Sequence, residues 1–218
     1  QSYLNLKTYL LLFLLSTLPF FLKAQVTDDF ESNSVNGWTS EGDGVARLAQ
    51  NFGNPGASLE VLDAATGDIN YSITPRKYLG NWLINHSAND SISLDVNVNS
   101  SDPDTLVNAF PVFQIIGPGG RAIGLNGLQL PSNQWNRVAI PLDSTEWIIE
   151  EGNWNAILEN VTLFRIRAEY ITGSETVFLD NVRLSLSPER GQIKDTICST
   201  FEDGTFDGWN FVDAGGVS

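Results

Sequence analysis

Alternation of apolar and polar residues with a period of two runs through most of this chain, and it restricts the fold to antiparallel β-structure. Residues 91–99 show it most clearly, with isoleucine, leucine and two valines at every second position and polar residues between them. Residues 162–170 alternate in the same way, which places Phe164 toward a core and both Arg165 and Arg167 toward solvent. The pattern predicts strands with one buried and one wet face.

Helical periodicity is nearly absent, and the strand-like runs are separated by clusters of Gly, Asn, Asp and Pro. This organisation predicts an all-β antiparallel sandwich with one short helix at residues 153–159. The further strands that we predict are residues 45–50, 58–62, 69–74, 110–116, 122–128, 135–141 and 176–185.

The first 24 residues have the composition of a secretory signal peptide. Lys7 precedes a run of mostly apolar residues at 9–22, and Lys23 and Ala24 follow it. The run is short and is broken by Pro19, whereas a membrane-spanning helix needs about 20 apolar residues. We therefore predict a signal peptide at residues 1–24, a secreted or cell-surface protein and no membrane insertion after cleavage; an uncleaved anchor is the alternative.

The charge of the chain argues against several classes of partner. Its formal net charge is −14, and removal of residues 1–24 takes away Lys7 and Lys23 but no acidic residue, which leaves −16. A surface this acidic repels phosphate backbones and anionic lipids, so we expect no nucleic-acid partner. It suits either divalent cations or simple solubility. The single cysteine, Cys198, precludes a disulfide within the main module.

An opening motif occurs twice. Five residues separate Phe30-Glu31 from Gly37-Trp38, and the same pattern returns as Phe201-Glu202 and Gly208-Trp209. The repeat predicts a multimodular protein whose modules are covalently linked neighbours. We divide the chain into a module at residues 25–186, a linker at 187–197 and the truncated start of a second, similar module at 198–218.

One carboxylate lies at an unexpected position in the predicted strand 176–185. Alternation places Asp180 on the same face as Phe178, Val182 and Leu184. A carboxylate among apolar groups needs a partner, because burying an uncompensated charge is costly. An arginine, backbone amides and a metal ion are all possible partners.

A calcium ion shared between the two ends of the module is one interpretation. Asp29 and Glu31 lie near its start and Asp180 near its end, and the termini of a sandwich are usually close together. The other interpretation is that loop amides hold Asp180, or that it lies near an exposed edge of its strand.

Several segments give the chain a family resemblance. The most specific are Arg-Ala-Glu-Tyr at 167–170 and Leu-Asp-Asn-Val at 179–182; segments 78–82, 126–128, 134–135 and 140–142 add to them. Together they resemble the laminin B domain, also called laminin domain IV, over about residues 28–184. The resemblance implies an extracellular jelly-roll sandwich related to galactose-binding and carbohydrate-binding modules.

The flanks of the module differ from those of animal laminins. They lack cysteine-rich repeats resembling epidermal growth factor, which favours a bacterial type of secreted multimodular protein over a basement-membrane protein. In carbohydrate-binding modules that open in the same way, a structural Ca²⁺ is common. Carried over by position, the resemblance implies a calcium site formed by Glu31, the backbone of Asp29, Asn54 and Asp180.

The wet face supplies the candidates for ligand binding. Sugars present apolar CH faces and fixed hydroxyls, which planar polar groups and aromatic rings recognise. The ligand candidates are Asp95, Asn97, Arg165 and Arg167, with Gln114 added if its strand is central in the sheet; for the two arginines, charge pairing across strands is an equal alternative. We predict Trp38 and Trp135 in the core, and Trp82, Trp147 and Trp154 in loops, either exposed or as lids over the core.

Catalytic chemistry has little support. The one histidine, His86, lies in a polar loop at residues 85–90 and has no obvious nucleophile, so a Ser-His-Asp arrangement is not supported. One His and one Cys do not form a usual zinc site. We therefore predict a non-catalytic module that binds a glycan or an extracellular protein; a purely structural spacer is the alternative.

Overall fold

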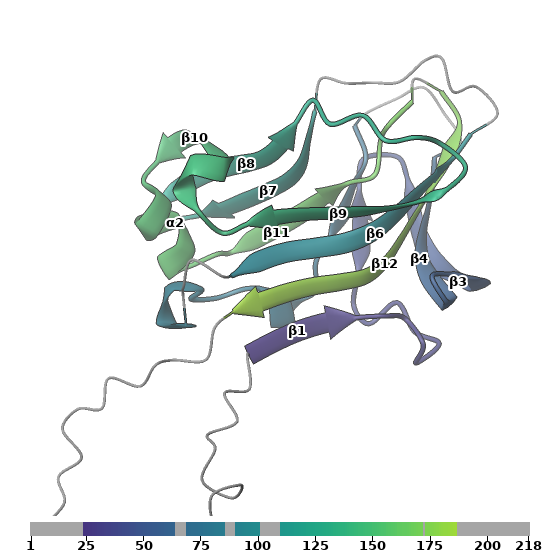
Figure 1. The fold of residues 1–218 in the computed structure, drawn as a ribbon, viewed down its shortest axis with the longest axis horizontal. Helices are drawn as coiled ribbons and strands as arrows, with labels where there is room; N and C mark the ends of the chain where they lie inside the picture. The colour runs from purple at the N-terminus through teal and green to yellow at the C-terminus, as the bar shows by residue number, and fades with distance from the viewer. Residues whose placement is uncertain (1–23, 64–68, 86–89, 101–109, 172, 187–218) are drawn as a thin grey trace, which may run out of the picture.

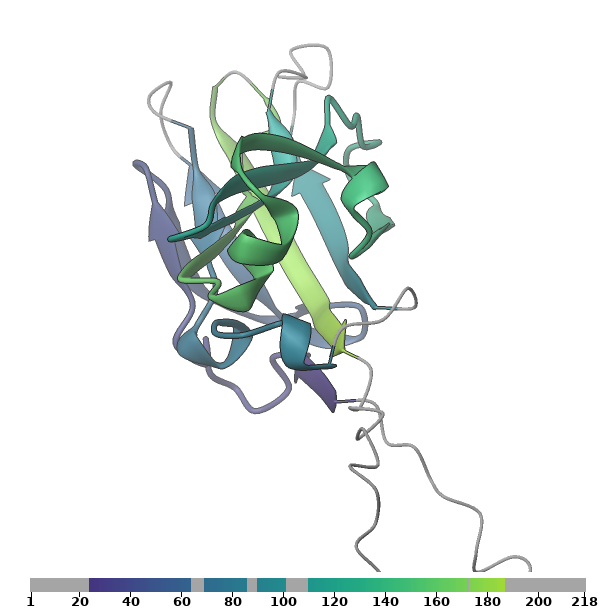
Figure 2. The same ribbon diagram turned by 90° about the vertical axis from the view of Figure 1, so that its left-hand side faces the viewer.

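The computed structural model describes residues 24–63, 69–85, 90–100, 110–171 and 173–186. The linker, the start of the second module, His86 and nearly all of the signal-peptide segment lie outside these residues. The described part confirms the predicted all-β jelly-roll, because two six-stranded sheets lie face to face (Figures 1 and 2) and every strand pair is antiparallel.

Sheet I runs in the order β3-β4-β12-β6-β9, and β1 pairs with the end of β12. Its strands are β1 (Ala24–Asp28), β3 (Val45–Gly53), β4 (Gly56–Asp63), β6 (Ser91–Asn99), β9 (Trp135–Pro141) and β12 (Glu175–Leu186).

Sheet II runs in the order β10-β8-β7-β11-β5-β2. Its strands are β2 (Thr39–Glu41), β5 (Tyr71–Ile73), β7 (Pro111–Gly117), β8 (Gly120–Asn126), β10 (Trp147–Gly152) and β11 (Leu163–Arg167). The predicted helix is α2 (Trp154–Glu159), and the Asn153 side chain caps it by accepting hydrogen bonds from two amides of its first turn. Three short 3-10 helices, η1 (Arg76–Tyr78), η2 (Leu83–Asn85) and η4 (Ser144–Glu146), complete the described elements.

The core between the sheets follows the alternation in the sequence. Every second side chain of β6, from Ile92 to Val98, is fully buried there. Aromatic rings fill the middle of the core, where Phe164 contacts Tyr78, Trp82 and Phe113.

The tryptophans divide differently from the prediction. Trp38 is in the core as expected, and Trp82, Trp147 and Trp154 are buried there as well. The core assignment of Trp135 is wrong. It begins β9 on the outer face of sheet I, half-buried, with its ring centroid 6.3 Å from that of Phe52.

A β-bulge in β12 overturns the predicted face of Asp180. Between the pairs Asp180–Asp95 and Arg183–Ser93, β12 advances three residues while β6 advances two. Asn181 absorbs the extra residue with a positive φ of 49°. Val182 and Leu184 therefore face the core, whereas Phe178 and Asp180 lie on the outer face of sheet I.

The described part begins and ends at one place. Ala24 pairs with Leu186, so the start of β1 and the end of β12 lie side by side in both views (Figures 1 and 2). Within the described residues, no helix is both long and apolar enough to cross a membrane.

Candidate functional site

A cleft of about 440 Å³ lies on the outer face of sheet II. Three neighbouring strands form its floor: β5 supplies Tyr71, β7 supplies Gln114 and β11 supplies Arg165. Arg165 and Gln114 are direct cross-strand partners, so the pairing register itself brings these side chains together. The sequence placed Gln114 in the site on condition that its strand is central, and β7 does lie between β8 and β11.

Hydrogen bonds fix the orientation of the floor. The Arg165 Nε donates to Gln114 Oε1 at 2.9 Å, and Gln114 Nε2 donates to the Tyr71 hydroxyl at 2.8 Å. The guanidinium lies 4.5 Å from the centre of the Tyr71 ring, within the range of a cation–π contact. Burial raises the pKa of Tyr71, although the charges of Arg165 and Arg167 act against the shift. The phenol therefore stays neutral and serves as a hydrogen-bonding group.

Two ion pairs form the sides of the cleft. Arg165 Nη1 contacts the Glu41 carboxylate of β2 at 2.7 Å, and Arg121 of β8 contacts Glu150 of β10 at 2.5 Å. The four charges cancel, so this cleft is electrically balanced on a protein that is strongly acidic overall. Such a surface suits a neutral ligand that offers several hydroxyl groups.

In strand β5 the apolar side chains face outward and the polar ones face inward, which is the reverse of the usual arrangement. Its apolar side, with Ile69 before the strand and Tyr71 within it, lines the cleft. Asn70, Ser72 and Thr74 instead point away from the cleft and are buried. A strand that presents its apolar side outward supplies the hydrophobic lining that ligand clefts need.

The structure corrects the position predicted for Arg167. Its side chain is fully buried, and its Nη1 and Nη2 donate to the backbone oxygens of Phe110 and Leu128 at 2.5 and 2.7 Å. The guanidinium also stacks 4.0 Å from the centre of the Tyr170 ring. Arg167 is therefore a structural residue under the cleft and not part of its surface.

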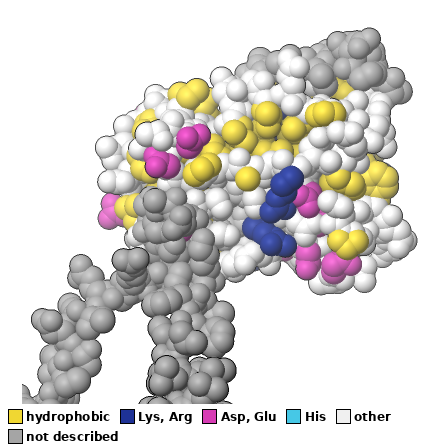
Figure 3. All heavy atoms as spheres, in the orientation of Figure 1, with side chains coloured by type: hydrophobic (Ala, Val, Ile, Leu, Met, Phe, Trp, Pro, Cys, Tyr) yellow, Lys and Arg dark blue, Asp and Glu magenta, His cyan; other side chains and the backbone are white. Residues whose placement is uncertain are grey.

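Asp95 and Asn97 lie on the opposite side of the molecule from Arg165. Both point outward from β6 in sheet I, so the single wet face expected from the sequence is in fact two faces. Arg137 of β9 donates to Asp95 at 2.9 Å, and Asn97 lies between Phe178 and Trp135 in register. Figure 3 views this face: basic and acidic side chains meet over β6 and β12, with hydrophobic side chains around them.

Asp180 lies beside Asp95 and is held by backbone amides. Its two oxygens accept hydrogen bonds from the amides of Asn54 and Asn181 at 2.5 and 2.6 Å. Burial raises the pKa of Asp180 to about 6; the two amides oppose the shift, while the charges of Asp95 and Glu31 add to it. Two of the four predicted calcium ligands, Asn54 and Asp180, are thus in direct contact, and Asn54 also donates to Asp95. Glu31 acts on Asp180 through its charge.

Glu31 and Asp29 have partners of their own. Glu31 Oε1 accepts a hydrogen bond from the amide of Ala57 at 2.9 Å, which ties the loop after β1 to the start of β4. The Asp29 carboxylate accepts one from the Glu31 amide at 3.2 Å, so its side chain shapes the loop. The carboxylate and amide oxygens gathered here are the donor type that calcium prefers.

The family follows from the sequence profile of the laminin B domain (domain IV), which matches residues 71–195, more than half of the chain. The chain belongs to the laminin B family. The matched range includes the strands that form the floor of the cleft, β5, β7 and β11. A comparison with curated protein sequences found no match.

Solved structures place this laminin B module among β-sandwiches. The L4b domain of human laminin α2 superposes with a TM-score of 0.52 at 13% identity, over 77% of this chain and 99% of that domain. An exo-β-agarase matches with a TM-score of 0.50 at 11% identity, over 78% of this chain and 25% of its own. A family 11 carbohydrate-binding module from Clostridium thermocellum, in complex with a β-1,3-1,4-mixed-linked tetrasaccharide, has a TM-score of 0.47 at 19% identity, over 75% and 96%.

The sequence did not single out every residue that shapes the cleft of the laminin B module. Glu41, Arg121 and Glu150 come from strands at the two sides of sheet II, and only the pairing order brings them toward Arg165. Tyr71 lay within the predicted strand 69–74, but the alternation of that strand favours the core for Tyr71, so the sequence carried no signal for its place in the cleft.

Proposed function

We propose that this laminin B module is a non-catalytic extracellular module that binds a neutral glycan in the cleft of sheet II. The observation that carries the proposal is the network of Arg165, Gln114 and Tyr71, which fixes planar polar groups on the floor of an open, charge-balanced cleft. Sugar hydroxyls need donors and acceptors held in this way, since disordered polar groups lose entropy on binding.

Apolar side chains complete the recognition surface. Ile69 and Phe110, both partly exposed, line the cleft beside the polar network. The CH faces of a sugar ring pack against such groups while its hydroxyls reach Arg165 and Gln114. The cleft volume falls in the range of small-molecule sites, roughly 300–1,000 Å³.

The acidic residues of the cleft support binding and not hydrolysis. Hydrolysis of a glycoside usually requires two carboxyl groups, one of them in surroundings that favour its protonated form. Glu41 and Glu150 each contact an arginine instead. Secretion through the predicted signal peptide at residues 1–24 and linkage to neighbouring modules belong to the same proposal.

Binding to a glycan array should depend on Arg165. We expect Arg165→Ala to weaken the binding of any retained glycan by about tenfold or more, because a charged hydrogen bond contributes about 1.5–3 kcal/mol. Arg137→Ala is the matched control, since Arg137 also projects from a strand to a carboxylate but lies on sheet I. Titration calorimetry with the array hits measures both variants.

Two results would contradict glycan binding in this cleft. An array on which the full chain retains no glycan favours the spacer. If Arg165→Ala and Arg137→Ala weaken glycan binding equally, the cleft of sheet II is not the binding site.

We also propose a structural calcium ion at the cluster of Glu31, Asn54 and Asp180, with the backbone of Asp29. The support is the donor chemistry and the mutual repulsion of Asp180, Asp95 and Glu31, which is among the causes of the raised pKa of Asp180 and which a cation would offset. A bound ion would join the loop after β1 to the turn before β4 and to β12.

Calcium should raise the melting temperature less in Asp180→Asn than in the unaltered chain. Saturation at 100 times Kd contributes about 2.7 kcal/mol, which for a domain of this size corresponds to roughly 5–10 °C. Glu60→Gln is the control, because Glu60 pairs with Arg47 on the same sheet face. Differential scanning calorimetry in calcium and in chelator measures the difference. If calcium raises the melting temperature of Asp180→Asn as much as that of the unaltered chain, calcium does not bind at Asp180.

A further inference from the structure

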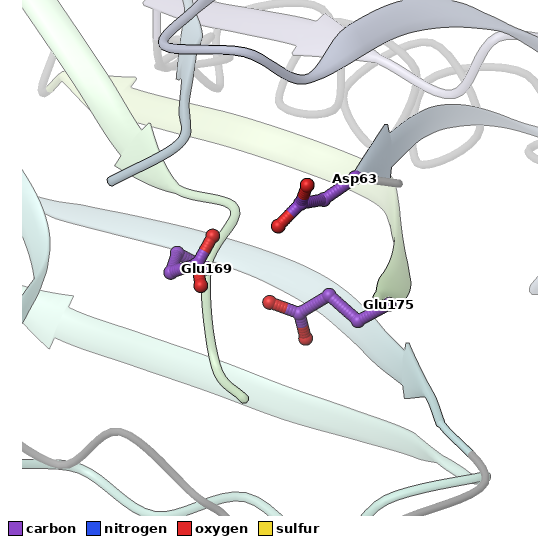
Figure 4. Close-up of side chains that lie close together, drawn as sticks. All are labelled: Asp63, Glu169 and Glu175. Carbon is purple, nitrogen blue, oxygen red and sulfur yellow. The ribbon is translucent and has the colours of Figure 1, made fainter. Parts of the chain in front are cut away.

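Three acidic side chains converge inside the sandwich, away from both sites described above. Asp63 is the last residue of β4, and Glu175, the first residue of β12, is its direct cross-strand partner. Glu169 follows β11 two residues after its end. One carboxylate oxygen from each of the three lies within 4.8 Å of the others, and Figure 4 shows the three groups pointing toward one another.

The strand period explains why these carboxylates are buried. Asp63 shares the face of Leu59 and Val61 on β4, and Glu175 shares the face of Val177 and Leu179 on β12. That face is the core, and Asp63 and Glu175 are only 1% and 2% exposed. Asp63 and Glu175 thus continue the core-facing rows of β4 and β12 and form a pair of acidic side chains at one end of the core.

Hydrogen bonds satisfy only part of the cluster. Glu175 Oε1 accepts hydrogen bonds from the amides of Tyr170 and Ile171 at 2.6 and 3.3 Å. Glu175 Oε2 is buried and has no hydrogen-bond partner among the described residues. A buried carboxylate oxygen without a partner is costly, and here it belongs to the group that faces the other two acids.

Asn70 is placed to hold Glu169. Its Oδ1 accepts a hydrogen bond from the Gly44 amide at 2.5 Å, which directs its Nδ2 to Glu169 Oε2 at 3.0 Å. Burial raises the pKa of Glu169 to about 8 and that of Glu175 to about 7, and the neighbouring carboxylates add to both shifts. The nearby cation, Arg167, donates to two backbone oxygens and stacks on Tyr170, so it compensates the cluster only from a distance.

We propose that Asp63, Glu169 and Glu175 bind a divalent cation, with calcium preferred. The ligands are three carboxylates, the hard oxygen donors that calcium and magnesium prefer. Magnesium keeps several waters in near-ideal octahedral geometry, whereas calcium accepts irregular sets of carboxylates. The buried oxygen of Glu175 would become a ligand, and the two charges of the ion would offset most of the negative charge of the three carboxylates.

The ion would join the two sheets. Asp63 and Glu175 belong to sheet I, while Glu169 continues from β11 of sheet II. This site is separate from the cluster at Asp180, because five residues of strand span about 16 Å and Asp180 faces outward. The proposal rests neither on glycan binding nor on the calcium site at Asp180.

Calcium titration of the full chain after chelation tests the proposal. At pH 7.5, calorimetry with CaCl₂ should show that Glu175→Gln binds one ion fewer than the unaltered chain, or binds it at least about tenfold more weakly. Glu60→Gln should match the unaltered chain, since Glu60 lies on the outer face of β4. Asp180→Asn should retain this ion, which separates the two calcium proposals.

A measurement on the unaltered chain decides the matter if Glu175→Gln does not fold. The amide NMR signals of Tyr170 and Ile171, which donate to Glu175, should shift on addition of calcium. Unchanged signals, or a folded Glu175→Gln variant that binds as many ions as the unaltered chain, would overturn the proposal and leave protons to neutralise the cluster.

Discussion

Replacing Arg167 with alanine should lower the free energy of unfolding by about 3–5 kcal/mol, because it removes a fully buried side chain that donates to two partly buried carbonyl groups and stacks on Tyr170. A loss of this size is a large fraction of the stability of a typical domain. Urea denaturation followed by tryptophan fluorescence measures it.

Arg165→Ala is the control for this prediction. Arg165 belongs to the same strand, but it opens into the cleft and its partner Glu41 is about half exposed, so we expect a smaller loss, about 1.5 kcal/mol or less. The two arginines would then have different roles: loss of Arg167 lowers stability, whereas loss of Arg165 weakens ligand binding. Equal losses of stability would contradict a structural role specific to Arg167.

Replacing Phe164 with alanine should also lower the free energy of unfolding strongly, by about 3–5 kcal/mol. Its fully buried ring contacts those of Tyr78, Trp82 and Phe113, and therefore connects the rings at the centre of the core. Phe164→Leu keeps most of the volume and should cost less than about 1.5 kcal/mol.

Phe52→Ala provides the comparison at the surface. Phe52 also stacks on another phenylalanine, Phe178, but is 40% exposed, so its removal leaves a smaller cavity and loses less apolar burial. We expect a loss of about 1 kcal/mol or less. Urea midpoints with unchanged slopes establish the ranking, and an equal cost for Phe52 and Phe164 would refute it.

Residues 91–99 and 162–170 show why the fold was predictable. Their alternation reports directly which side chains are buried, and Ile92 and Phe164 are in the core as expected. The pattern failed at Asn181, because a bulge inserts one residue and exchanges the two faces without any change in composition. Asp180 was therefore correctly identified as unusual but assigned to the wrong side of its strand.

The candidate sites were harder to predict, because they depend on which strands are neighbours. Arg165 and Gln114 are 51 residues apart, and only the pairing of β11 with β7 makes them partners. Asp95 and Asn97 alternate just as Arg165 does, yet they belong to the other sheet. Asp63 and Glu175 showed no anomaly in sequence, because acidic residues at strand ends are common at the surface. Calcium binding stays a prediction at both acidic clusters.

The adjacent ends of β1 and β12 determine how the module would respond to tension. A pull on the chain from both sides would act on Ala24 and Leu186, which lie opposite each other at the same end of one antiparallel ladder. The pairs of this ladder would then open one after another, as a zipper does, without being sheared together. The short β1 would peel away first, and β12 would remain held by β4 and β6 within sheet I.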